Sequence, residues 1–325
     1  MTTHIFVMIA AIVLLAAALY FLILYGVYRA AFGTKGKKNP DPMNLPKGSQ
    51  YDGYADRMKS LVRTALEIPY EEVRIKSFDG LTLFGRYYEG KPGAPCALLF
   101  HGYRSAGVRD FAGGLQILKN EGYHVILPDE RAIGKSGGTT ISFGINERQD
   151  VKAWAEYANR RFEDGTPLML YGISLGGATV LMALSEELPV NVKGVAADCP
   201  YAVPRDIILK VAQDRHYPLK AVWFLVKHAS RVFGHFDIEA CNARDAAAGS
   251  DLPILLIHGT GDRFVPADCS REIYAACGGD GNGRVQLELF PGAAHGISFL
   301  QDEDRYKQVI TEFSRKVTGW DSAGN

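Results

Sequence analysis

Apolar residues along the chain follow three patterns. A continuous apolar run extends from Ile5 to Tyr28 without one charged residue. From Tyr70 onward, two alternating segments are followed by short apolar runs that do not alternate, and helical patterns lie between most of these runs. Runs without alternation are typical of strands buried on both faces. The pattern therefore predicts an α/β fold, with a mostly parallel sheet covered by helices on both faces.

The alternating segments 73–78 and 81–88 flank Asp79-Gly80, a dipeptide typical of a hairpin turn. Residues 204–239 have helical patterning without a strand, so we expect an insertion above the sheet there, called the cap below. Further strands are expected at residues 97–100, 124–128, 168–172, 192–197, 254–257 and 285–290. Helices are expected at residues 52–68, 111–120, 145–161, 176–187, 270–277 and 304–317.

The first apolar run is long enough to cross a bilayer. As a helix that rises ~1.5 Å per residue, it would reach roughly 36 Å. A cleaved signal peptide is the alternative, but signal peptides begin with basic residues, and residues 1–4 contain no Lys or Arg. We therefore expect residues 1–32 to form an uncleaved, single-pass membrane anchor. Arg29 and three lysines within residues 35–38 follow the apolar run, so the positive-inside rule predicts that the rest of the chain is cytoplasmic.

The predicted domain organisation has three parts: the anchor, a linking segment at residues 33–69 and a main domain at residues 70–325. Residues 33–50 are rich in Gly, Pro and Lys and have no apolar period, which is typical of a tether. The tether lysines either contact anionic lipid or are simply solvated.

Composition excludes several classes of protein. The chain has 325 residues, of which 47% are hydrophobic, so a sizeable core can form. Its 36 basic and 36 acidic residues balance, which leaves no overall field for binding nucleic acid. The five cysteines are widely spread and form no zinc-ligand spacing, so we expect neither a disulfide framework nor a structural metal.

The pattern G-x-S-x-G, typical of a nucleophilic serine on a sharp strand-to-helix turn, occurs twice. Ser174 follows an apolar strand pattern and precedes a helical one. Ser136 also follows a strand pattern, but Gly-Gly-Thr-Thr comes after it, and Asp129 stands where a phosphate-binding loop requires its first glycine. We therefore predict that Ser174 is a nucleophile and that Ser136 is a structural loop residue.

A nucleophilic serine needs a base that removes its proton and a carboxylate that orients the base. Asp262 lies in a Gly-rich turn after the predicted strand 254–257, and His295 lies in the turn after strand 285–290. Because the carboxyl ends of parallel strands share one edge of a sheet, we expect both to meet Ser174 there.

An acyl-transfer site also needs two donors for the oxyanion of its tetrahedral intermediate. The N–H of Leu175 lies at the start of the helix after the nucleophile, where the helix dipole also helps. Gly102 allows a sharp turn after strand 97–100 that would aim the N–H of Tyr103 inward. We therefore predict that Tyr103 and Leu175 form the oxyanion hole.

Over residues 70–317 the chain resembles the α/β-hydrolase superfamily, in its serine hydrolase branch. The predicted triad follows the family order of serine, aspartate and histidine, and His101-Gly102 matches the family motif before the first helix. Residues 129–136 resemble the family loop D-x-R-G-x-G-x-S, with Ala132 in place of a glycine. Residues 198–201, together with the anchor, resemble a bacterial membrane-anchored subgroup. The resemblance implies an α/β-hydrolase fold with a short helical cap.

Other residues compete for these roles. Asp198 ends an earlier strand and is the alternative to Asp262 as the triad acid. His101 and His258 each precede a glycine in a strand-exit turn, so we interpret them as structural histidines rather than bases. Cys199 has no evident basic partner, which favours a buried apolar role over a nucleophilic one.

The cap combines six basic and two acidic residues at 204–236 with apolar residues between them. It would shape an apolar pocket over the site, and it either contacts an anionic bilayer or carries merely solvated charges.

The sequence thus predicts a membrane-anchored serine hydrolase that cleaves an acyl bond of a small molecule, with a carboxylic ester favoured, and that needs no cofactor. A peptidase, a thioesterase or a lysophospholipase would use the same triad. A catalytically idle, membrane-tethered scaffold is the alternative from another class.

Overall fold

The computed structural model describes residues 2–34, 38–46, 48–162, 165–281 and 283–321. Its centre is an eight-stranded sheet in the order β1-β2-β4-β3-β5-β6-β7-β8. The first two strands form the expected antiparallel hairpin, β2 is antiparallel to β4, and the remaining neighbours are parallel. The strands are β1 Glu71–Lys76, β2 Thr82–Tyr88, β3 Cys96–Phe100, β4 His124–Pro128, β5 Leu168–Ile173, β6 Val192–Asp198, β7 Ile254–Gly259 and β8 Val285–Phe290.

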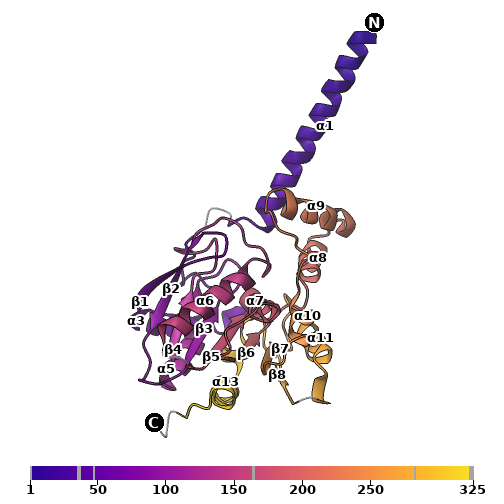
Figure 1. Ribbon diagram of the computed structural model, residues 1–325. Helices are drawn as coiled ribbons and strands as arrows, with labels where there is room; N and C mark the ends of the chain where they lie inside the picture. Colours follow the sequence, from indigo (N-terminus) through magenta and orange to yellow (C-terminus); the bar gives the residue numbers. More distant parts are fainter. Residues whose placement is uncertain (1, 35–37, 47, 163–164, 282, 322–325) are drawn as a thin grey trace.

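Helices cover both faces of this sheet (Figure 1). Alternate side chains of a central strand enter different cores: Leu98 packs in one, whereas Leu99 packs in the other. This division explains the absence of alternation in the sequence, because both faces of each strand are buried. One face carries α3 Ala55–Glu67, α4 Gly107–Asp110, α5 Ala112–Asn120, α12 Ser298–Gln301 and α13 Glu303–Thr318. The other face carries α6 Glu147–Arg161, α7 Leu175–Met182, α10 Ala243–Ala248 and α11 Asp268–Ala276. The expected α/β-hydrolase fold is therefore confirmed.

The cap consists of two helices, α8 Pro204–Asp214 and α9 Leu219–Val232. Neither contributes to the sheet; α9 lies beside the end of the N-terminal helix, α1 Thr2–Ala31, and α8 lies next to α9 (Figure 1). Pro204 begins α8, a position where the missing N–H of proline costs no intrahelical hydrogen bond.

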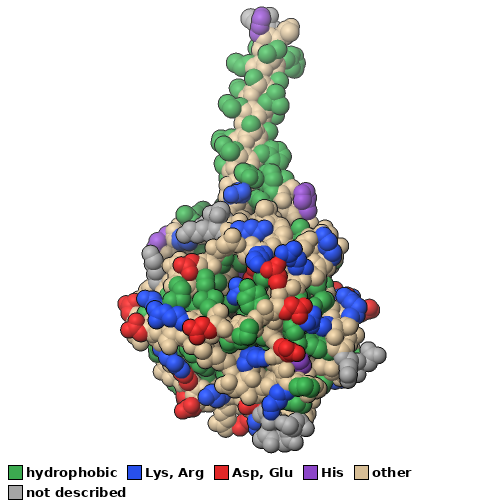
Figure 2. Space-filling model, turned by 90° about the vertical axis from the view of Figure 1, so that its left-hand side faces the viewer, with side chains coloured by type: hydrophobic (Ala, Val, Ile, Leu, Met, Phe, Trp, Pro, Cys, Tyr) green, Lys and Arg blue, Asp and Glu red, His purple; other side chains and the backbone are tan. Residues whose placement is uncertain are grey.

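Helix α1 projects away from the body of the molecule, and apolar side chains surround its projecting part (Figure 2). Residues 3–31 are apolar and long enough to cross a membrane. The end of α1 differs, since Leu24 and Tyr28 are buried, as is Phe32 directly after the helix. They pack against the cap, where Trp223 and Val226 of α9 belong to the same apolar cluster. The carboxyl end of α1 is thus docked on the cap.

The segment interpreted as a tether runs along the main domain. The backbone of Gly33 bridges to Thr140, and the Lys38 carbonyl accepts a hydrogen bond from the N–H of Gly134 at 2.6 Å. The Asn44 carbonyl accepts a hydrogen bond from Arg109 at 2.7 Å. Backbone hydrogen bonds of this kind need no apolar period, so the sequence pattern did not indicate them.

The helix expected at residues 52–68 also differs at its start. The main helix α3 begins at Ala55, and a single turn, α2 Ser49–Asp52, precedes it. Gly53 lies between the two helices, and a glycine costs more conformational entropy in a helix than alanine.

Candidate active site

The turn between β5 and α7 presents Ser174 at the carboxyl edge of the sheet. Its backbone has φ 56° and ψ −114°, a conformation that non-glycine residues rarely adopt. A Cβ on Gly172 would lie 2.1 Å from the carbonyl oxygen of Gly176, and a Cβ on Gly176 would lie 1.9 Å from that of Phe100. Both glycines of the motif are therefore required by close backbone approach, which holds the serine in its strained position.

Three side chains distant in sequence form one chain of hydrogen bonds. The Nε2 atom of His295 lies 2.9 Å from the hydroxyl oxygen of Ser174. The Nδ1 atom of the same ring lies 2.6 Å from Oδ2 of Asp262. With Asp262 ionised, Nδ1–H donates to the carboxylate and Nε2 accepts from the serine hydroxyl. This arrangement gives the serine a proton acceptor.

The carboxylate of Asp262 is held by the turn around it. Its Oδ1 accepts hydrogen bonds from the N–H groups of Phe264 and Val265, both at 2.9 Å. Burial alone would raise the pKa of the Asp262 carboxyl, but hydrogen bonds from His258 and His295 outweigh it and lower that pKa to about 2. Asp262 is therefore an anion at neutral pH and can stabilise an imidazolium.

His258 braces this turn. Its Nε2 atom lies 2.9 Å from the Val265 carbonyl and 3.5 Å from Oδ2 of Asp262, and its Nδ1 atom lies 2.7 Å from the hydroxyl of Ser270. His258 is fully buried behind Asp262. Its position supports the structural interpretation and adds a direct contact with the acid.

Asp198 is buried beside this site but does not partner the imidazole. Its Oδ2 accepts a hydrogen bond from Tyr306 at 2.7 Å, and Tyr306 in turn contacts the hydroxyl of Tyr171. Burial raises the pKa of Asp198 to about 6. The hydrogen bonds of His295 therefore favour Asp262 over Asp198 as the acid of a triad.

A metal site is the other arrangement to consider here. The ligand atoms of Cys199, Asp262 and His295 all lie within 4.8 Å of one another, a spacing at which three groups could hold a metal ion. Burial raises the pKa of the Cys199 thiol well above its usual range, so a thiolate ligand is disfavoured. The two remaining groups already hydrogen-bond to each other. This donor set fits a hydrogen-bonded pair better than a metal.

The loop after β3 has its conformation set by two side chains. His101 lies 2.9 Å from the Gly102 carbonyl through Nδ1 and accepts a hydrogen bond from the N–H of Glu130 through Nε2 at 3.0 Å. The carboxylate of Asp110 accepts from the N–H of Gly102 at 2.8 Å. Sequence reasoning missed Asp110, because a single acid within a short helix carries no distinguishing pattern.

The two residues predicted to supply the oxyanion hole lie near the serine: Leu175 follows it in the chain, and Tyr103 lines the same cavities. Within the described ranges, neither the N–H of Tyr103 nor that of Leu175 donates to another protein atom. The first N–H groups of a helix have no intrahelical partner, which leaves that of Leu175 available. The phenol of Tyr103 points elsewhere and donates to the carbonyl of Ala31 at 2.6 Å.

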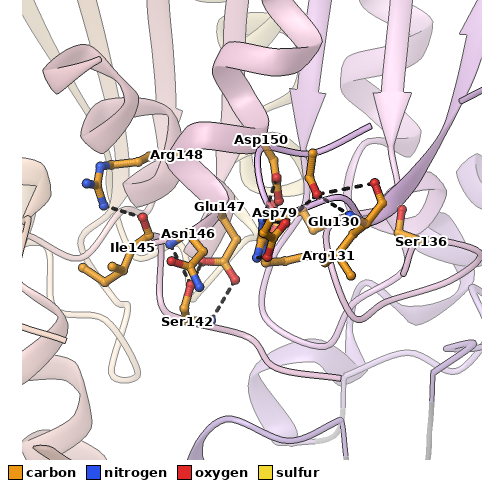
Figure 3. Close-up of polar contacts among 12 residues, drawn as sticks. Asp79, Glu130, Arg131, Ser136, Ser142, Ile145, Asn146, Glu147, Arg148 and Asp150 are labelled. Atoms are coloured by element: carbon orange, nitrogen blue, oxygen red, sulfur yellow. Dashed lines mark hydrogen bonds and ion pairs between the residues drawn. The ribbon is translucent and has the colours of Figure 1, made fainter. Parts of the chain in front are cut away.

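A buried ionic cluster supports the neighbouring loops (Figure 3). The guanidinium of Arg131 contacts Asp150 at 2.6 Å and Asp79 at 3.1 Å. The carboxylate of Glu147 closes the adjacent loop by accepting hydrogen bonds from backbone N–H groups of residues 142 and 144. Ser136, the second G-x-S-x-G serine, accepts from the N–H of Phe84 at 2.9 Å and lies in this structural region. Its contacts agree with a loop role.

Two cavities meet at Ser174. The larger measures about 430 Å³ and is lined by His295, Asp198, Arg109 and residues of α3 and α5, among others. The smaller measures about 220 Å³ and lies between Ser174, the cap and the end of α1. Tyr103 and Phe264 line both cavities, so the serine has room on two sides.

Comparisons with known proteins agree with this architecture. The curated protein YfhR of Escherichia coli O157:H7 is 25% identical over 248 residues, which cover 74% of this chain and 78% of YfhR. The uncharacterized membrane protein YNL320W of Saccharomyces cerevisiae is 24% identical over 192 residues, 59% of this chain and 61% of that protein. The aligned region covers 62% of the length of one curated bacterial relative and 80% of the length of another.

The structure of the esterase Pf2001 of Pyrococcus furiosus superposes with a TM-score of 0.64 at 23% identity, covering 78% of this chain and 94% of the esterase. Residues 109–320, more than half of the chain, match the prolyl oligopeptidase family. The chain therefore belongs to the prolyl oligopeptidase family, among the serine hydrolases of the α/β-hydrolase superfamily.

Proposed function

We propose that this protein is a membrane-anchored serine hydrolase that cleaves a carboxylic ester of a small molecule. The observation that carries the proposal is the position of His295, which contacts the Ser174 hydroxyl at 2.9 Å and the Asp262 carboxylate at 2.6 Å. An imidazole between a hydroxyl and an anionic carboxylate is the arrangement that makes serine nucleophilic.

The proposed reaction has two halves. Ser174 Oγ attacks the ester carbonyl while His295 takes its proton, and the N–H groups of Tyr103 and Leu175 stabilise the oxyanion. The intermediate collapses to an acyl-enzyme as His295 gives the proton to the leaving alcohol. Water, deprotonated by the same imidazole, then releases the carboxylic acid and restores the serine.

The experiment measures hydrolysis of p-nitrophenyl esters and labelling by a small fluorophosphonate. Ser174→Ala is expected to abolish labelling and to lower kcat/KM by at least about 10⁴-fold, because nothing else supplies the nucleophile. Asp262→Asn is expected to lower kcat by about 10⁴-fold, since the imidazole loses the anion that sets its tautomer.

Ser136→Ala is the matched control, because it removes the serine of the other G-x-S-x-G match, and it is expected to retain kcat. Ester hydrolysis that survived Ser174→Ala would overturn the proposal. Absence of labelling in the unaltered chain would favour the idle scaffold, and faster cleavage of peptide amides than of esters would favour a peptidase.

We further propose that α1 spans a bilayer as an uncleaved anchor and that the hydrolase domain is cytoplasmic. The long apolar helix and the membrane protein among the relatives support an anchor, whereas a signal sequence would pass the same test of length and apolarity. The basic residues that follow the apolar run support the orientation.

A further inference from the structure

The lining of the two cavities at Ser174 indicates which part of the proposed ester each cavity can hold. The leaving alcohol must receive a proton from His295, and His295 lines the larger cavity. The smaller cavity is lined by Leu175, a proposed oxyanion donor, whereas Tyr103 lines both cavities. This arrangement favours departure of the alcohol into the larger cavity and extension of the acyl group into the smaller one.

The walls of the smaller cavity are mainly apolar. Ile207, Ile208 and Val211 of α8 form one wall, and Phe143, Tyr201 and Val265 lie among the remaining lining residues. An apolar wall favours an apolar ligand, because burying its polar groups without partners would cost free energy. We take the volume of one chain carbon as roughly 30 Å³, the volume share of one water in the liquid. The cavity of 220 Å³ then holds an acyl chain of about seven carbons.

The last turn of α1 completes this cavity. Ala30 and Ala31 line it, and the phenol of Tyr103 donates to the carbonyl of Ala31. Arg104 donates to the carbonyls of Ala30 and Gly33, which fixes the end of the helix to the loop after β3. The helix that would cross the bilayer therefore forms part of the wall beside the nucleophile.

Helix α9 and the connection before it also carry apolar side chains that stay exposed to solvent. Tyr217, Leu219, Phe224 and Val232 are exposed by 54%, 36%, 51% and 42%, respectively. Exposed apolar residues beside a membrane helix are typical of a surface that contacts a bilayer. If α1 crosses a bilayer, the cavity lined by its last turn lies close to the membrane interface.

We propose that the smaller cavity is an acyl-chain subsite and that the last turn of α1 completes it. This subsite takes the medium-length fatty acyl chain of an amphiphile from the bilayer surface. This assignment rests on the proposed ester hydrolase function and names its substrate class. It makes the membrane helix a specificity element as well as an anchor.

The test measures kcat/KM of the full chain in lipid nanodiscs for p-nitrophenyl esters from acetyl to hexadecanoyl. Each buried methylene contributes about fourfold in binding, so kcat/KM is expected to rise at least tenfold from acetyl to octanoyl and to fall again at hexadecanoyl. Equal rates for acetyl and octanoyl esters would overturn the subsite.

Two variants fill the cavity from different walls. Ile208→Trp on α8 and Ala31→Trp on α1 are each expected to lower the octanoyl-to-acetyl ratio of kcat/KM at least tenfold. Val190→Trp, 91% exposed and remote from both cavities, and Ala17→Trp, on the projecting part of α1, are matched controls expected to keep the ratio.

Labelling by a small fluorophosphonate shows that each variant retains a folded site. An unchanged ratio in both labelled cavity variants would overturn the acyl subsite while leaving the ester hydrolase intact. A reduced ratio in Ile208→Trp alone would overturn the role of α1. Failure of the unaltered chain to label would overturn the ester hydrolase function itself.

Discussion

Ser174 has a strained backbone conformation, and it carries the hydroxyl that is proposed as the nucleophile. Its φ of 56° requires support from the surrounding turn, where the N–H of the serine donates to the Asp198 carbonyl at 2.8 Å. Residues held in such conformations cost about 1–3 kcal/mol each. Part of the stability of the fold is therefore used to present one hydroxyl.

Replacing this serine by glycine relieves the strain. Ser174→Gly and Ser174→Ala are both expected to be inactive, but the glycine variant is expected to be about 1 kcal/mol more stable. Relief of about 1–3 kcal/mol of strain exceeds the 0.5–1 kcal/mol entropic cost of a glycine. Denaturant unfolding of the two variants side by side measures the difference, and a less stable glycine variant would contradict the strain at this position.

Asp198 makes the stability of the protein depend on pH. Its pKa is about 6 in the folded chain against an ordinary value of 3.8, because burial disfavours the anion. Since the folded pKa is raised, the stability associated with the neutral acid is present below about pH 4 and is lost as pH rises to about 6.

Asp198→Asn keeps an acceptor for Tyr306 and cannot ionise. Its unfolding free energy is expected to match that of the unaltered chain near pH 4 and to exceed it by about 2–3 kcal/mol above pH 7, at 1.36 kcal/mol per pKa unit. Urea unfolding at pH 4 and at pH 8 measures both gaps. A gap that did not widen with pH would show that the folded carboxyl keeps its ordinary pKa.

The junction between α1 and the cap is closely packed, unlike an ordinary linker. Phe32 is fully buried there, and its ring lies 5.2 Å from that of Phe236 and 5.9 Å from that of Phe143, edge to face in both cases. Such ring pairs contribute beyond the area that they bury. The packing couples the position of the cap to that of α1.

Phe32→Ala is expected to loosen the cap. Removing a buried phenyl ring costs about 3–5 kcal/mol, and the loss falls on the α1–cap contact. Limited proteolysis is expected to cut the connection between α8 and α9 at least tenfold faster than in the unaltered chain. Phe21→Ala is the matched control, because the ring of Phe21 is 50% exposed. Equal cleavage rates in the two variants would show that α1 does not hold the cap.

For the whole molecule, the proposed anchor would determine where the active site lies. Because the end of α1 is buried against the cap, little free chain would separate a bilayer crossed by α1 from the hydrolase domain. Zero net charge gives no long-range attraction to lipid, so the proposed membrane attachment would depend on the apolar length of α1.

A membrane test separates the anchor from a cleaved signal. After alkaline carbonate extraction, the full-length chain is expected in the membrane pellet, with an unprocessed N-terminus by mass spectrometry. External protease is expected to digest the hydrolase domain in inside-out vesicles and to spare it in right-side-out vesicles. A soluble product that begins after the apolar run would instead identify a signal sequence.

Local patterns in the sequence predicted most of the fold. The strands and main helices agree with the predicted ranges, and the runs at β3 to β7 do not alternate because both faces of these strands are buried. The strand-to-helix turn around Ser174 was likewise readable, since Gly172 and Gly176 are required within five residues of one another. The sequence did not indicate α2, α4, α10 and α12, which are too short to show a period.

Sequence order, apolar period and the glycines of one turn thus determined the class of fold, the expected nucleophile and the apolar N-terminal helix. Only the tertiary structure decided that His295 contacts Asp262 rather than Asp198, that His258 and Asp110 brace the site, and that α1 closes a cavity beside Ser174. The contacts of His295 and α1 join segments far apart in the chain, whereas those of His258 and Asp110 depend on how a loop folds back on itself. Their partners are selected by packing and hydrogen bonding in three dimensions, which no local pattern encodes.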